Sequence, residues 1–105
     1  MTQPAGHVEL VIRTASSLLI GRLAPREAVT ILATQTPLAL ERAAALARTE
    51  PELSRNYAAV VRSVYAELAG RSFSGTEAHD VTAVREDLAA LSQALETSSG
   101  GSLSS

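Results

Sequence analysis

The stretch formed by residues 25–48 constrains the fold most, because it is apolar around most of a helical circumference. At about 100° per residue, its apolar side chains form a main face and a second strip beside it. The main face consists of Ala28, Ile31, Leu32, Leu38, Ala39, Ala43 and Leu46, and the second strip of Val29, Ala33, Leu40 and Ala47. A helix with such a narrow polar sector is normally covered on more than one side. We therefore predict that it is the central helix of an all-α protein, covered by the rest of the chain or by a second subunit.

Pro37 lies inside this predicted helix and leaves two models open. A proline at this position removes one backbone hydrogen bond, and its ring clashes with the carbonyl group of Ala33. In the first model, which we favour, the helix kinks at Pro37. In the second, it ends just before Thr36, which then caps a new helix that begins at Pro37.

A helix that precedes this stretch is predicted over residues 6–23. Residues 8–12 are apolar and β-branched, and a strand is the competing interpretation there. The helical apolar period continues to the end of the range, however, and this favours a helix. Leu10 and Ile20 fall outside its apolar face. Residues 1–5 carry no periodic pattern, and we expect them to be frayed.

A third helix is predicted over residues 51–69. Thr49 and Glu52 have the spacing of a capping box, in which each side chain bonds the backbone N–H of the other residue. Gly70 is expected to end the helix in a left-handed conformation. Tyr57 is expected to be a core tyrosine whose hydroxyl group reaches the edge of the apolar face. That face consists of Leu53, Tyr57, Val60, Val61, Val64, Tyr65 and Leu68, with Arg55 and Arg62 opposite it.

A fourth helix is predicted to end near residue 96, and it carries a narrow heptad stripe. The stripe consists of Val81, Val84, Leu88, Leu91 and Leu95. Such a stripe suits a peripheral helix laid against one groove, or a short coiled-coil contact with another chain. Residues 97–105 are rich in serine and glycine and have too little apolar surface to fold. The predicted fold is thus an all-α antiparallel bundle over residues 6–96, with four helices, or five if Pro37 splits one of them.

Composition sets several chemistries aside. The chain has no cysteine, which excludes disulfides, thiolate metal sites and thiol catalysis. His7 and His79 each lack a second histidine at helical spacing, and the sequence contains no Glu-x-x-His motif and no glycine-rich phosphate loop. We therefore predict a protein that is not an enzyme, with no catalytic residue, metal or cofactor.

Charge and hydropathy bear on location and partners. Nine basic residues, all of them arginine, stand against eleven acidic ones, and no run of like charge marks a nucleic-acid or membrane-surface binder. No apolar run is long enough to span a membrane, and no basic leader is present. Arginine without lysine, together with abundant alanine, indicates GC-rich codons. We expect a bacterial, cytoplasmic protein that binds neither membranes nor nucleic acid.

One region resembles a known family. The segments Ala15-Ser-Ser-Leu-Leu-Ile-Gly-Arg22, Glu27-Ala28 and Leu40-Glu-Arg-Ala-Ala44 resemble the helical RNA-binding domains called ANTAR. That family's pattern has an Ala-x-Gly-x-Leu-Met segment, a Glu-Ala pair and a basic third helix. The resemblance covers about residues 13–47 and implies an RNA-binding regulator. The chain departs from it at Pro37-Leu-Ala-Leu40, which replaces the family's basic stretch and leaves little charge to hold a phosphate backbone.

The surplus of apolar surface predicts a protein partner. Several apolar side chains of the first two helices point away from the main faces, and exposed apolar patches generally mark contact sites. On the third helix, tyrosine and arginine are the residue types that interaction hot spots favour. We predict a non-catalytic helical interaction module, homodimeric or bound to another protein; the alternative is a bundle whose kinked helix opens a cavity for small hydrophobic molecules. The candidate interface residues are Leu10, Ile20, Val29, Leu40, Arg55, Arg62 and Tyr65.

Overall fold

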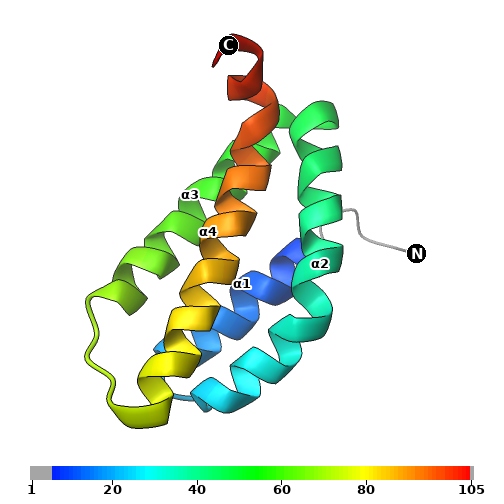
Figure 1. Cartoon of the computed structure of the whole chain (residues 1–105). Coiled ribbons are helices and arrows are strands. Elements are labelled where there is room, and N and C mark those ends of the chain that lie inside the picture. The colour runs from blue at the N-terminus through cyan, green and yellow to red at the C-terminus, as the bar shows by residue number, and fades with distance from the viewer. Residues whose placement is uncertain (1–5, 105) are drawn as a thin grey trace.

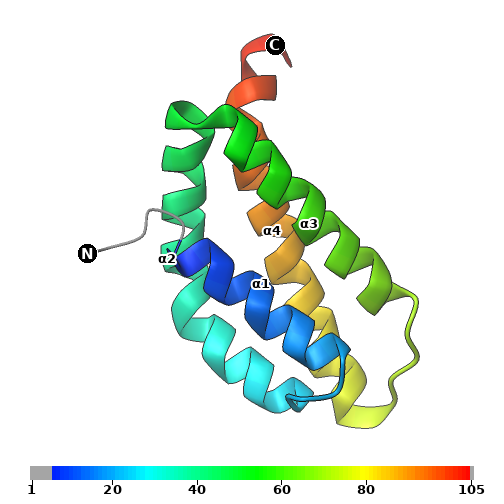
Figure 2. The same ribbon diagram turned by 180° about the vertical axis from the view of Figure 1, so that it is seen from behind.

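The computed structural model describes the backbone of residues 6–104 and the side chains of residues 6–96. This part of the chain forms four helices and no strand: α1 (Gly6–Leu19), α2 (Pro25–Thr49), α3 (Pro51–Ala69) and α4 (Gly75–Ser104). Figures 1 and 2 show α1 on one side of the molecule and α4 on the other, with α2 and α3 beside both. Each helix runs opposite to the one before it. The predicted antiparallel four-helix bundle is confirmed.

α2 is one continuous helix that contains Pro37, so the five-helix alternative is wrong. Figure 1 shows that the axis of α2 bends about midway along its length, in keeping with the kinked model. Thr36 does not cap a new helix; it is buried, and its hydroxyl group donates a hydrogen bond to the Asp87 carboxylate of α4 at 3.3 Å. Pro37 and Ala33 are both exposed. The carbonyl group that the proline leaves without an N–H partner can therefore bond to water.

α1 ends at Leu19, and the prediction that it continues to residue 23 is wrong. The cause is Gly21, whose φ of 82° lies in the left-handed region that glycine adopts without strain. The backbone N–H of Gly21 bonds the carbonyl of Leu18 at 3.1 Å, and that of Arg22 bonds the carbonyl of Ser17 at 2.8 Å. This pair of bonds is the Schellman arrangement, which satisfies the last carbonyls of a helix and turns the chain toward α2.

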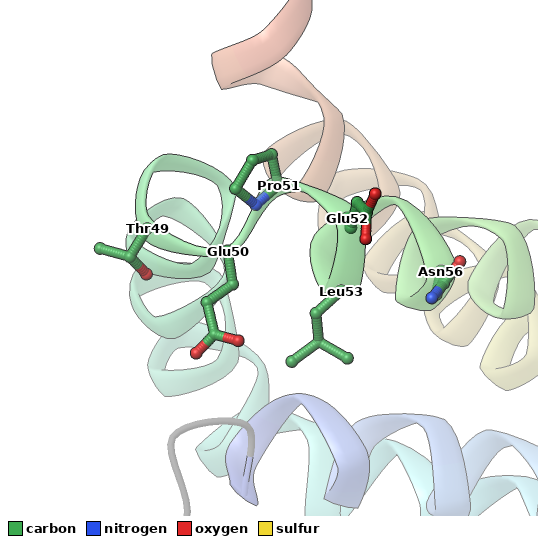
Figure 3. Close-up of a pocket in the computed structure, with 6 residues that line it drawn as sticks. All are labelled: Thr49, Glu50, Pro51, Glu52, Leu53 and Asn56. Carbon is green, nitrogen blue, oxygen red and sulfur yellow. The ribbon is translucent and has the colours of Figure 1, made fainter.

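The corner between α2 and α3 contradicts the predicted capping box. Thr49 still belongs to α2, and its hydroxyl group donates to the carbonyl of Ala45, one turn back, at 2.9 Å. Glu50 is the residue that both ends α2 and precedes α3, and its side chain makes no cap hydrogen bond. Figure 3 shows the Thr49 side chain pointing away from Glu52. Pro51 then starts α3, since its missing N–H costs nothing at the first helical position.

The ends of α3 and α4 also differ from expectation. α3 ends before Gly70 as predicted, but Gly70 has a φ of −83°, so the predicted left-handed conformation is wrong. In the connection between α3 and α4, the left-handed glycine is Gly75, with a φ of 63°, where α4 begins. The backbone of α4 continues to Ser104, beyond the predicted end. The frayed terminus over residues 1–5 and the serine- and glycine-rich tail fall outside the residues whose side chains are described, and both stay predictions.

The core is aliphatic and is organised around α4. All five residues of its heptad stripe are buried, and α4 packs along both α2 and α3. α4 thus lies against the groove between α2 and α3, in keeping with the first interpretation of the stripe, and the stripe is not free to pair with another chain. Burial of one such side chain contributes roughly 1.5–3 kcal/mol. Two residues assigned to apolar faces lie largely outside the core: Leu38 is 40% exposed and Val60 is 45% exposed.

Polar side chains join neighbouring helices at the margins of this core. Between α1 and α3, the Tyr57 hydroxyl donates to Glu9 Oε2 at 2.6 Å, as expected of a core tyrosine that reaches an edge. Between α3 and α4, the hydroxyl group of Ser54 donates to the carbonyl of Leu95. Ser54 is buried, although the sequence pattern placed no polar residue there. These bonds tie α3 to α1 and to α4 at defined positions.

Candidate functional site

The predicted interface residues lie on different parts of the surface. Ile20, in the turn after α1, is 64% exposed, whereas Leu10 on α1 is partly buried. Val29 and Leu40 pack against the core from α2, so the chain itself covers them in part. Of the four apolar candidates, only Ile20 is therefore largely exposed. The remaining three belong to α3, and two of them come together.

An open groove between α3 and α4 brings Arg62 and Tyr65 together. It has a volume of about 220 Å³ and is lined by Arg62, Tyr65, Leu88, Ala89 and Ser92; we call it the α3–α4 groove. Leu88 and Ser92 are buried and form its floor, while Ala89 is exposed at its margin. The groove exists because alanine and serine follow Leu88 on this side of α4, and neither is long enough to cover it.

Arg85 adds a second arginine beside the groove, and the sequence analysis missed it. Its guanidinium carbon lies 5.4 Å from the centre of the Tyr65 ring, in the range of a cation–π contact. Arg85 Nε is buried, and among residues 6–96 no atom accepts a hydrogen bond from it. Arg85 lies one helical turn before Ala89, at the edge of the heptad stripe, and this spacing could have indicated that it lies beside the groove.

The two arginines differ in their partners. Arg62 forms an ion pair with Glu96. The Arg62 side chain is 59% exposed and the Glu96 side chain is 40% exposed. Within the described part of the chain Arg85 makes no ion pair. The α3–α4 groove is thus a short, largely apolar groove with Arg62 in its lining and Arg85 beside it. Arg55, the remaining candidate of α3, is exposed but does not line it.

Comparison of the chain with protein-family models, with curated proteins and with solved structures gives no match. Arguments about function therefore rest on the geometry of the chain itself. The segment that resembles ANTAR domains, residues 13–47, covers the second half of α1 and most of α2. In the described range, no helix is both long enough and apolar enough to cross a membrane.

A second hollow, between α1 and α2, has a volume of about 230 Å³ and is polar. It is lined by His7, Leu38, Glu41 and Arg42. His7 Nδ1 and Gln35 Oε1 are 3.0 Å apart, which gives the histidine a hydrogen-bond partner across the two helices. No group of three or more histidine, aspartate or glutamate side chains among the described residues is arranged to hold a metal ion.

A third hollow lies at the corner between α2 and α3 and is shown in Figure 3. Its volume is about 490 Å³, and Glu50 and Leu53 point to the same side of it, toward α1. Glu52 and Asn56 lie side by side on the outer surface of α3. With exposed carboxylates and a single leucine, this corner offers no arrangement of hydrogen-bond donors or apolar surface comparable to that of the α3–α4 groove.

Proposed function

We propose that this chain is a non-catalytic helical interaction module that binds a helix of another protein in the α3–α4 groove. The observation that carries the proposal is the combination of an apolar floor, the ring of Tyr65 and two arginines at one place on the surface. Tyrosine and arginine are enriched at interaction hot spots, because each combines a large contact area with directed hydrogen bonds.

The size of the groove supports a side chain as its occupant. Pockets for small molecules typically measure about 300–1,000 Å³, whereas this groove measures about 220 Å³ and is open along one side. A docked helix needs only to insert one or two apolar side chains and can rest its backbone on the exposed Ala89. Binding of a free hydrophobic molecule stays the alternative, and a thermal-shift series with fatty acids tests it, because a ligand of the native state must raise the unfolding midpoint.

Self-association stays a prediction, and fewer exposed apolar residues support it than the sequence indicated. Since Val29 and Leu40 pack against the core, exposed apolar surface is contributed mainly by Ile20, Leu38 and Val60, which lie on different elements. Light scattering behind a sizing column, at two protein concentrations about a hundredfold apart, distinguishes a monomer from a dimer.

The proposal is tested by blocking the groove. Ala89→Arg places a long charged side chain at its margin, and Ala59→Arg makes the same change at an exposed position of α3 outside the groove. Tagged wild-type and variant proteins are used to capture partners from a lysate of the source organism, and the bound proteins are quantified by mass spectrometry. We expect a partner that wild type and Ala59→Arg retain and that Ala89→Arg loses. If all three proteins capture the same set, the groove is not the binding site and the proposal is wrong.

A further inference from the structure

We propose that the occupant of the α3–α4 groove is an acidic amphipathic helix. Its apolar side chain enters the groove, and its carboxylates on either side pair with Arg62 and Arg85. The inference rests on the proposed function and adds the chemistry of the partner.

Arg85 is the main reason to expect a carboxylate. Its charge has no acidic partner among residues 6–96, and its contact with the Tyr65 ring holds the guanidinium group beside the groove. The buried Nε is a donor without an acceptor in the described structure. An unsatisfied donor on a cation is costly, and a carboxylate that draws the side chain outward removes that cost.

Arg62 supplies the second contact, because its present ion pair is weak. Both it and Glu96 are substantially exposed, and exposed ion pairs contribute little to stability. An incoming carboxylate can therefore share or replace this pairing without disturbing the core. A planar guanidinium group binds a carboxylate through two parallel hydrogen bonds, which also orients the docked helix.

The position of the two arginines limits the partner further. Arg62 lies one turn before Tyr65 on α3, and Arg85 contacts the Tyr65 ring from α4. A helix that lies along the groove would carry its acidic residues on the same face as its apolar residue, so that both arginines can reach them. A partner with basic residues at these positions would be repelled by both arginines.

The probe is a fluorescein-labelled, amidated peptide of about 15 residues. It carries two leucines one turn apart, with glutamates on the same face at either side. The matched peptide has glutamine in place of each glutamate. Fluorescence anisotropy gives the affinity of each peptide for the full chain. We expect the glutamate peptide to bind about tenfold more tightly than the glutamine peptide, or better. Its affinity should decrease when the salt concentration is raised from about 50 to about 500 mM, because the contacts are charged. Equal affinity of the two peptides would overturn the proposal.

Variants place the interaction on the structure. We expect Arg85→Gln and Arg62→Gln each to weaken binding of the glutamate peptide about fivefold or more. Arg85→Lys keeps the charge and should retain part of the affinity, which separates loss of charge from a packing defect. Arg13→Gln, an exposed site on α1, should have no effect. If Arg13→Gln weakens binding as much as the other two, the interaction depends on net charge alone and the proposal is wrong.

The outcomes separate this inference from the proposed function. If Ala89→Arg loses a native partner that Arg85→Gln retains, the groove binds a partner but the partner is not held by carboxylates. If Ala89→Arg instead converts a dimer into a monomer, the occupant is a second copy of the chain and the acidic-helix proposal is wrong. Failure of both the capture experiment and the peptide titration overturns both proposals.

Discussion

Tyr57→Phe is the substitution that best tests the packing of α1 against α3. It removes one hydroxyl group, whose hydrogen bond to Glu9 Oε2 measures 2.6 Å, and it leaves the ring in place. A hydrogen bond to a charged acceptor contributes about 1.5–3 kcal/mol when buried. Because Glu9 is only partly buried and can turn toward water, we expect a loss of about 1–2 kcal/mol in the free energy of unfolding at pH 7.

The effect should depend on pH in a defined direction. Burial, the hydrogen bond to Glu9 and the negative charge of Glu9 raise the pKa of Tyr57 from 10.0 to about 12. Between these two pH values the unfolded chain has released the phenolic proton and the folded chain still holds it. The free energy of unfolding of the wild-type protein therefore falls as pH rises, by at most about 1.4 kcal/mol per pH unit. Tyr57→Phe has no proton to lose at this position, so the difference between the two proteins should shrink.

Urea denaturation followed by circular dichroism, at intervals from pH 7 to 11, measures both effects. Tyr65→Phe is the matched control, because no described residue forms a hydrogen bond with the Tyr65 hydroxyl group, and we expect a change of less than about 0.5 kcal/mol. By pH 11 the gap between wild type and Tyr57→Phe should have closed by up to about 1.4 kcal/mol. A gap that stays constant across this range would refute the reasoning, and so would equal stability of the two proteins at pH 7.

Three further predictions concern the core, a carboxylate and a turn. Leu91→Ala removes a fully buried side chain of α4 and should lower the free energy of unfolding by about 3–5 kcal/mol in urea titrations. Burial raises the pKa of Asp87 although the hydrogen bond from Thr36 lowers it, so the folded state holds this proton more tightly than the unfolded chain. The free energy of unfolding of wild type should therefore decrease relative to that of Asp87→Asn as pH rises above 3.8. Urea denaturation at pH values from about 3 to about 7 measures this trend, and at neutral pH the variant should be at least as stable as wild type. Gly21→Ala forces a β-carbon into the left-handed region and should lower the midpoint of thermal unfolding, at a cost of about 1–2 kcal/mol, whereas Gly70→Ala, with its φ of −83°, should not lower it.

The sequence predicted the helices and their buried faces better than it predicted which side chains neighbouring helices would cover. The heptad stripe of α4 is buried in full, because five aliphatic side chains at that spacing can lie on one face only of a helix. Its narrow width suggested a helix laid against one groove, and α4 does lie in the groove between α2 and α3. The buried face of α4 is nevertheless wider than the stripe, because Ser92 is buried and Ala94 is partly buried against the core. Small residues widen the buried face of a helix without adding to its apolar pattern.

The error at the start of α3 arose because one side chain had two possible partners. The hydroxyl group of Thr49 can bond an N–H ahead of it or the carbonyl one turn behind it, and sequence spacing describes only the first choice. Errors at the edges of faces had another cause. A helical wheel gives the angle of Val60 and Leu38 but not the side from which a neighbouring helix approaches. Arg85 was missed for the same reason, because its importance comes from Tyr65, a residue of another helix.

The α3–α4 groove follows from how the core is built. Small residues let α4 lie close to α2 and α3, but where Ala89 and Ser92 follow Leu88 they also leave a hollow of about 220 Å³ beside Tyr65, although Leu88 itself is fully buried. A larger apolar residue at position 89 would fill that space and bury more surface, since cavity-filling substitutions commonly add about 0.5–2 kcal/mol of stability. The chain instead keeps a groove lined by Tyr65 and Arg62, with Arg85 beside it. The proposed binding of a partner at this place would give that arrangement a purpose.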